Sequence, residues 1–171
     1  DDEINDDDEN CDFTCVYNIR NDVDNFVSIS GLFDSQNELN KQAESCLRYA
    51  MKVKQIIKNF ELEEQFNLFI HARIVVCMGG PIDGIVDDPE NPKLEIFSNL
   101  LNEADRIRDM ADLDSVCINE EVYNYIVKDN YDIEERFDLE NNQIGNGQKV
   151  FVVNRCSVNK KNENNVFIIN D

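Results

Sequence analysis

Apolar and polar positions along the first part of the chain follow two different periods, which predict two kinds of element. Residues 13–19 and 26–30 alternate as strands do, and the turn-rich run between them predicts a hairpin that ends at Gly31. From about residue 37 to residue 60, apolar residues recur near the helical period and leave lysine and glutamate on the other face. The chain is therefore expected to begin with a hairpin followed by a long amphipathic helix.

The middle of the chain carries its most apolar segment. Leu68–Met78 is too continuously apolar for a half-exposed strand, so it predicts a central strand buried on both faces. Residues 82–86 are its expected hairpin partner, and His71, the single histidine, is expected to be a core residue.

The second half of the chain predicts shorter elements. Ser98 or Asn99 can cap a helix that runs to about Ala111, and Asn119 can cap a short helix. Strands are expected at residues 94–97, 115–118, 131–139, 149–153 and, as an edge strand, 166–169. The order of strands and helices predicts an α+β fold with a largely antiparallel sheet.

Composition divides the chain into three parts. Residues 1–12 are rich in acidic residues and predict a linker or disordered segment, so we expect the chain to be a piece of a longer protein. Residues 13–155 hold the predicted elements and form one domain. Residues 156–171 are expected to be a C-terminal extension with the edge strand.

The net charge of the chain disfavours two classes of binding partner. Its 36 acidic residues outnumber 16 basic ones and give a formal net charge of -20. Nucleic acid and anionic membrane are both bound through clusters of lysine and arginine, so we expect neither nucleic-acid binding nor direct membrane contact. A metal-bound nucleotide or a basic protein partner is easier to accommodate.

The positions of the six cysteines indicate whether the protein is expected in an oxidising or a reducing compartment. Cys46, Cys77 and Cys117 lie within apolar runs, where a free cysteine behaves as a small hydrophobe, and no C-x-x-C motif occurs. We therefore expect a reduced, intracellular protein without a zinc site. A membrane tether or a ciliary setting through a larger parent stays open.

Three segments, in order and spacing, resemble the class III adenylyl/guanylyl cyclase catalytic domain. Residues 18–32, NIRNDVDNFVSISGL, are similar to the family pattern K-x-x-T-I-G-D-x-Y-M-x-x-S-G-L. Residues 73–79 with 83–86 are similar to R-I-G-I-H-x-G-x-x-x-A-G-V-V, and residues 94–107 to Y-x-x-[FW]-G-x-x-V-N-x-A-S-R-M. The resemblance implies a ferredoxin-like antiparallel sheet with extra strands, and a head-to-tail dimer with nucleotide sites at its interface.

The resemblance also implies a reaction and a metal site. Cyclisation joins the ribose 3′-hydroxyl to the α-phosphate of ATP or GTP and expels pyrophosphate, with Mg²⁺ or Mn²⁺ on the oxygens. Asp24 matches the second of the two family aspartates that hold the metals. The alternative is an ordinary turn aspartate. The first aspartate has no counterpart, although Asp22 is expected on the same side of a strand as Asp24.

Two residues of the third segment match catalytic positions of the family. Asn102 and Arg106 match the residues that orient the ribose and stabilise the phosphate charge, and their spacing puts them on one helix face. The alternative is an ordinary solvated polar face.

The remaining nucleotide-binding positions have diverged. The residues that select the base are Asn18 (or Arg20 at the glutamate position of guanylyl cyclases) and Glu95. Glu95 can accept from an adenine amino group or be a surface strand residue. Asn146 replaces a lysine that reaches the phosphates in the family, which loses a charge-assisted contact.

The sequence leaves three functions open. The first is a degenerate cyclase domain with a scaffold or regulatory role, which docks a second cyclase-homology domain or another protein subunit. The second is an active half of a heterodimeric cyclase, and the third is a module that holds nucleotide without turnover.

Overall fold

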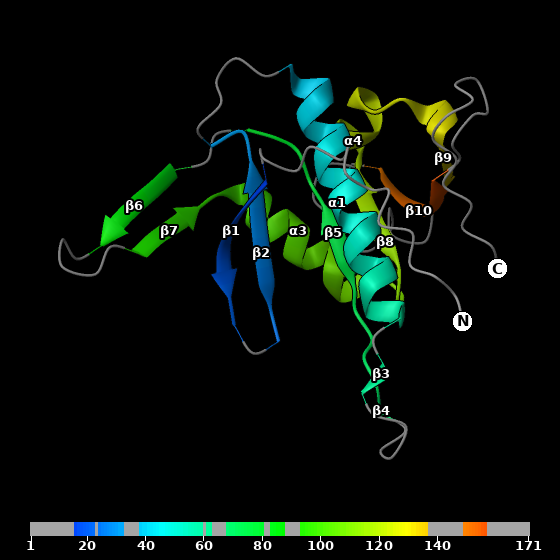
Figure 1. Cartoon of the computed structure of the whole chain (residues 1–171). Coiled ribbons are helices and arrows are strands. Elements are labelled where there is room, and N and C mark those ends of the chain that lie inside the picture. Colours follow the sequence, from blue (N-terminus) through cyan, green and yellow to red (C-terminus); the bar gives the residue numbers. More distant parts are fainter. Residues whose placement is uncertain are drawn as a thin grey trace, which may run out of the picture.

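The structure, a computed structural model, describes residues 16–22, 24–32, 38–59, 61–62, 68–80, 83–87, 93–136 and 149–156 (Figure 1). Its helices are α1 (Leu39–Asn59), α3 (Asn99–Met110), α4 (Glu120–Tyr125) and the 3-10 turn η1 (Lys128–Asn130). Its strands are β1 (Val16–Asn21), β2 (Phe26–Ser30), β3 (Glu61–Leu62), β4 (Leu68–Phe69), β5 (Ile74–Val76), β6 (Asp83–Asp87), β7 (Lys93–Phe97), β8 (Val116–Asn119), β9 (Tyr131–Glu135) and β10 (Val150–Cys156).

The main sheet has the strand order β5-β8-β10-β9. β10 pairs antiparallel with both β8 and β9, whereas β5 and β8 run parallel. Three two-stranded sheets complete the described part: β1–β2, β3–β4 and β6–β7, each antiparallel. The predicted α+β class is confirmed, with one parallel pair in an otherwise antiparallel set.

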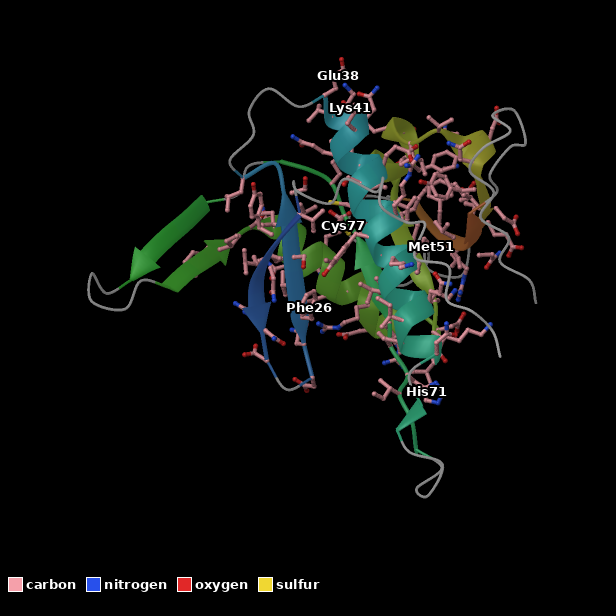
Figure 2. The ribbon with its side chains drawn as sticks, viewed as in Figure 1. Phe26, Glu38, Lys41, Met51, His71 and Cys77 are labelled. Atoms are coloured by element: carbon pink, nitrogen blue, oxygen red, sulfur yellow. The ribbon has the colours of Figure 1, made fainter. Side chains whose placement is uncertain are left out.

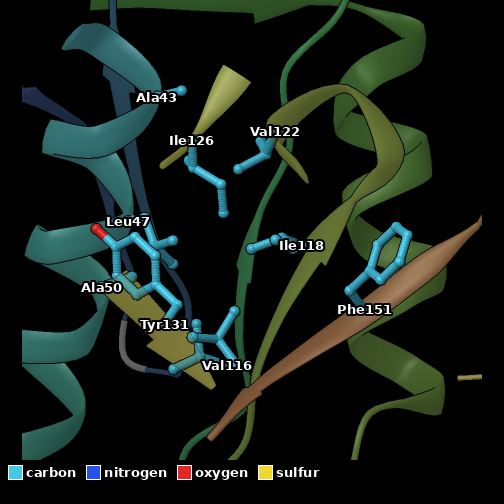
Figure 3. Packing of buried hydrophobic residues seen from close by; sticks show 10 residues of the cluster. Ala43, Leu47, Ala50, Val116, Ile118, Val122, Ile126, Tyr131 and Phe151 are labelled. Carbon is cyan, nitrogen blue, oxygen red and sulfur yellow. The ribbon is translucent and has the colours of Figure 1, made fainter. Parts of the chain in front are cut away.

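Helices α1 and α3 cover opposite faces of the main sheet, and β8 lies between them. Side chains alternate along a strand, so Val116 and Ile118 of β8 join the cluster with Leu47 of α1 (Figure 3). Cys117 joins the second cluster with Ile107 of α3. These five side chains are fully buried, which makes β8 the strand buried on both faces.

The prediction for Leu68–Met78 was wrong. The run forms two short strands, β4 and β5, and β5 lies at the edge of the main sheet as described, beside β8. The expected packing on both faces does occur, because Ile74 and Val76 pack against the cluster with α1 and Val75 packs against the cluster with α3. The predicted hairpin partner, residues 82–86, was also assigned wrongly, because β6 pairs with β7.

His71 is not a core residue. Its side chain is 53% exposed and lies away from the sheet core (Figure 2). His71 Nδ1 donates to Asp114 Oδ2 over 2.7 Å. His71 stands in an apolar run, but β5 begins only at Ile74, after this position, so the sheet does not cover it.

Local turn chemistry agrees with the sequence at several junctions. Gly31 ends the hairpin with a φ of 81°, a conformation that glycine adopts without strain. Ser98 Oγ accepts from the Leu100 N–H at the start of α3 over 3.1 Å. Asn119 Oδ1 accepts from the Val122 N–H at the start of α4 over 3.2 Å. The expected edge strand at 166–169 lies outside the described residues.

Within the described ranges, no helix is long and apolar enough to cross a bilayer.

Candidate functional site

The β1–β2 hairpin carries the metal candidate and one base-selecting candidate. Asn18 of β1 is paired with Ser28 of β2, and the register shifts between Asn18 and Arg20. Asp24 lies in the turn between the two strands, and its side chain is exposed. The turn is closed by the Asp22 N–H, which donates to the Asn25 carbonyl over 2.8 Å. A carboxylate at such a turn is accessible to a cation from solvent.

The expected pairing of Asp22 with Asp24 on one strand face does not occur. β1 ends at Asn21, so both aspartates belong to the turn rather than to a strand with alternating sides. Turn residues have no fixed period of two, and the argument from strand alternation therefore does not apply to them.

Helix α3 presents the catalytic candidates to solvent. Asn102 and Arg106 are both exposed, one helical turn apart, while Ile107 of the same helix is fully buried against the sheet. Arg108 is engaged with Asp105 over 2.7 Å and with Asp109 over 3.2 Å. Within the described part of the chain, Arg106 forms no such ion pair. Its guanidinium is available for an anionic ligand or an acidic partner.

The structure shows less about the other two nucleotide-binding candidates, Glu95 and Asn146. Glu95 lies in β7, where it is paired with Ile85 of β6. Asn146 lies outside the described residues. The structure therefore brings Asn102 and Arg106 together on one helix, and places Asn18 and Asp24 on one hairpin.

One polar cluster beside this helix was missed by the sequence analysis. The Asn119 side chain, expected only to cap α4, also donates to Glu103 Oε1 of α3 over 2.9 Å. Asn119 is 2% exposed. A capping residue can be predicted from its position in the sequence before a helix. The hydrogen bond between Asn119 and Glu103 joins residues 16 positions apart, and no local sequence pattern predicts it.

Burial raises the pKa of two thiols in the layer below α3. Cys77 follows β5, and burial is the main cause of its raised pKa, with smaller contributions from the negative charge of Glu103 and from Cys117. Burial likewise raises the pKa of the Cys117 thiol on β8. None of Cys46, Cys77 and Cys117 forms a disulfide, and of the three Cys117 alone is fully buried as a residue.

Solved structures with the same fold are guanylyl cyclase domains. The guanylate cyclase domain of RhGC from Catenaria anguillulae, solved in complex with GTP, matches with a TM-score of 0.66 and 18% identity, covering 83% of this chain and 74% of that one. A monomeric double mutant of the guanylyl cyclase domain of the RhoGC fusion protein from Blastocladiella emersonii matches with a TM-score of 0.65 and 19% identity, covering 84% and 72%. These likenesses confirm the ferredoxin-like, cyclase-type fold.

A third match is the non-canonical dimeric guanylyl cyclase domain of the same Blastocladiella emersonii fusion protein. It has a TM-score of 0.64 and 20% identity, and covers 81% of this chain and 71% of that one. A comparison with curated protein sequences found no match.

The family comparison covers most of the chain. The sequence pattern described as the adenylate and guanylate cyclase catalytic domain matches residues 1–155. It includes the β1–β2 hairpin and α3, where the candidate residues lie. The chain therefore belongs to the adenylate and guanylate cyclase catalytic domain family.

Proposed function

We propose that this chain is a catalytically degenerate cyclase-homology domain with a scaffold or regulatory role, acting through the surface that joins β6–β7 to α3. The observation that carries the proposal is that some residues of the family's catalytic site are kept in this chain while others are replaced. Asn102 and Arg106 are retained and exposed on α3. Asn18 is a neutral amide where the adenine-selecting members of the family have a lysine, and Asn146 replaces the lysine that reaches the phosphates.

The chemistry of cyclisation explains why these losses matter. Phosphoryl chemistry of this kind depends on metal ions and cations that stabilise the charge developing on the phosphate oxygens. Within the described ranges, Asp24 is not part of a cluster of three or more side chains that could hold a metal ion. If the domain is active, Mg²⁺ or Mn²⁺ would need further carboxylates beside Asp24. With 36 acidic and 16 basic residues, the chain adds further repulsion toward a bare triphosphate.

The proposed docking surface has a projecting shape and an apolar residue at its base. The β6–β7 hairpin forms its own two-stranded sheet and extends away from the main sheet (Figure 1). Phe97, the last residue of β7, is 56% exposed directly before the start of α3. Large apolar side chains exposed beside polar ones are common at protein contacts, so a protein partner fits this surface.

The occupant that we propose is a second cyclase-homology domain that carries less negative charge than this chain. The net charge of -20 opposes a second copy of the same chain and favours a basic partner. Cys46, Cys77 and Cys117 form no disulfide, which supports an intracellular setting for this assembly.

A cyclase assay tests the loss of catalysis. The purified chain is incubated with Mn²⁺ and either ATP or GTP, and cyclic nucleotide is measured against a control without protein. We expect no product above that control. Clear turnover by the chain alone would overturn the proposal.

The alternative, an active half of a heterodimer, is favoured by the unengaged guanidinium of Arg106. It requires that Asn102 and Arg106 contact a nucleotide. Titration calorimetry with Mn·GTP and Mn·ATP, on the wild type and on the double variant Asn102→Ala/Arg106→Ala, separates the two functions. Nucleotide binding that the double variant loses supports the alternative, whereas the docking role predicts no binding that depends on these side chains.

A further inference from the structure

The side chain of Asn119 joins three elements at one buried point. Its Nδ2 donates to the Met78 carbonyl over 2.8 Å and to Glu103 Oε1 over 2.9 Å. Its Oδ1 accepts from the Met78 N–H and from the Val122 N–H, both over 3.2 Å. One amide thus uses both donor hydrogens and both acceptor sites of its oxygen, and connects the segment after β5, the middle of α3 and the first turn of α4.

Ile107 and Leu100 of α3 make apolar contacts on the side of the helix that faces the sheet. Ile107 is fully buried in the cluster with Cys117 and Val150. At the first turn, Leu100 lies over Gly79, where an added Cβ would come within 3.1 Å of Leu100 Cδ1. Apolar contacts are not directional, so they set which face of α3 is buried but define its exact rotation less sharply than a hydrogen bond does.

A hydrogen bond is directional, so it can define the rotation of α3 about its own axis more sharply than the apolar contacts do. An N–H···O bond weakens steeply when its angle departs from linearity, so the bond from Asn119 to Glu103 favours one rotation of α3. Asn119 is itself held at its other three bonds and is buried, so it is a rigid anchor. Glu103 directly follows Asn102 in the helix and precedes Arg106 by one turn.

We propose that Asn119 and Glu103 are a positioning pair, which sets the rotation of α3 and thereby the direction in which Asn102 and Arg106 point. The use of that outer face belongs to the proposed function, on which this inference rests. In this role the pair acts through the helix, by holding α3 in one rotation.

Substitutions at Glu103 test the pair while leaving Asn119 in place as the cap of α4. Glu103→Ala removes the acceptor and keeps a strong helix former in α3. Glu103→Gln is the matched control, because its amide oxygen can accept the same hydrogen bond. Residual dipolar couplings of backbone amides report the orientation of α3 relative to β8 and α1. We expect Glu103→Ala to change the couplings of residues 99–110 while those of β8 and α1 keep their wild-type values, and Glu103→Gln to match the wild type throughout.

Amide hydrogen exchange gives a second measurement on the same variants. Loss of one hydrogen bond to a charged acceptor, about 1.5 kcal/mol, should speed exchange in α3 roughly tenfold in Glu103→Ala. A reversed pair adds a rescue. Asn119→Asp sets two carboxyl groups against each other, and Asn119→Asp/Glu103→Gln restores a donor on α3, so the double variant should exchange more slowly than Asn119→Asp.

The outcomes separate this inference from the proposed function. Wild-type couplings and exchange in Glu103→Ala would overturn the positioning pair, as would an Asn119→Asp/Glu103→Gln variant that gains nothing over Asn119→Asp. Both measurements use the chain without nucleotide or partner. They therefore stand even if the cyclase assay finds turnover, which would overturn the proposed function alone.

Discussion

At the scale of single residues, Asp114 links two segments that lead into neighbouring strands. Its Oδ1 accepts from the Ala72 N–H over 3.1 Å and its Oδ2 accepts from His71 over 2.7 Å. Its own N–H donates to the Ala72 carbonyl over 2.7 Å. Its φ of 59° lies in the left-handed region, which residues with a Cβ adopt at a cost. The bonds to residues 71 and 72 offset that cost and set the start of the parallel β5–β8 pair.

The backbone conformation of Asp114 yields a prediction in which glycine outperforms alanine. Asp114→Gly and Asp114→Ala both lose the carboxylate, so they differ mainly in the strain at φ 59°. We expect the glycine variant to be more stable by about 1 kcal/mol, because only alanine retains the Cβ clash. Urea unfolding followed by circular dichroism measures the difference. An alanine variant as stable as the glycine variant would show that the strain is not there.

The carboxyl group of Asp114 predicts a pH dependence. The hydrogen bond from His71 holds the pKa of Asp114 below its usual value, with help from the Ala72 N–H and the charges of His71 and Lys54. A depressed folded pKa means that the stabilisation is present above the unfolded pKa of about 3.9 and is lost as the pH falls through the lower folded value. The effect is small because the pair is exposed.

The matched variant for this pH dependence is Asp114→Asn, which cannot ionise. The stability difference between the wild type and Asp114→Asn should be smaller at about pH 3 than at pH 7. Urea midpoints at the two pH values measure it. A difference that stays constant, or grows toward low pH, would contradict the assigned role of the ionised carboxylate.

At the scale of elements, the sequence predicted what is local. The amphipathic period gave α1 to within two residues, and the caps Ser98 and Asn119 gave the starts of α3 and α4. Spacing on α3 predicted that Asn102 and Arg106 share an exposed face. The pairing of strands is not local, and there the sequence failed: β8, a run of only four residues, is the doubly buried strand, whereas the longer apolar run around β5 lies at the described edge.

The same distinction explains what the sequence could say about the site. A residue type before a helix or at a turn carries a local signal, as Asp24 and Asn119 do. The hydrogen bond between Asn119 and Glu103 joins residues 16 positions apart, and the one between His71 and Asp114 joins residues 43 positions apart. Such contacts follow from how β5, β8 and α3 come together, and no spacing along the chain encodes them.

The layer formed by α3, β5 and β8 predicts the reactivity of its thiols. Burial raises the pKa of both Cys77 and Cys117, and only the thiolate is a strong nucleophile. We expect both to react with iodoacetamide at about pH 8 more than tenfold more slowly in the folded protein than in urea. Mass spectrometry of labelled peptides resolves each site. Rapid labelling of Cys117 in the folded chain, or a disulfide between any two of Cys46, Cys77 and Cys117, would contradict this arrangement.

At the scale of the whole molecule, charge dominates over the few exposed apolar residues. The largest of these include Phe26 at 49% exposure on the hairpin and Phe97 at 56% on β7. Each can contribute to a contact, but two copies of the chain would each bring a formal charge of -20 to it. A specific partner with basic residues gains from the same field that a second copy must overcome.

This balance predicts that the chain alone is a monomer at physiological ionic strength. Charges on two approaching copies repel over a screening length of about 8 Å at 0.15 M salt and about 3 Å at 1 M, so any self-association should appear first at high salt.

Sedimentation velocity across this range of salt measures the oligomeric state of the wild type and of two variants. Arg106→Glu adds negative charge at the proposed docking face, and Lys58→Glu is a charge-matched control at the end of α1. Both substitutions lie on exposed helix positions, so the melting temperature of each variant should stay close to that of the wild type. A dimer that forms at high salt through the docking face should be weakened by Arg106→Glu more than by Lys58→Glu. A tight homodimer at physiological salt would refute the charge argument, and a symmetric pair of identical chains would then replace the heteromer.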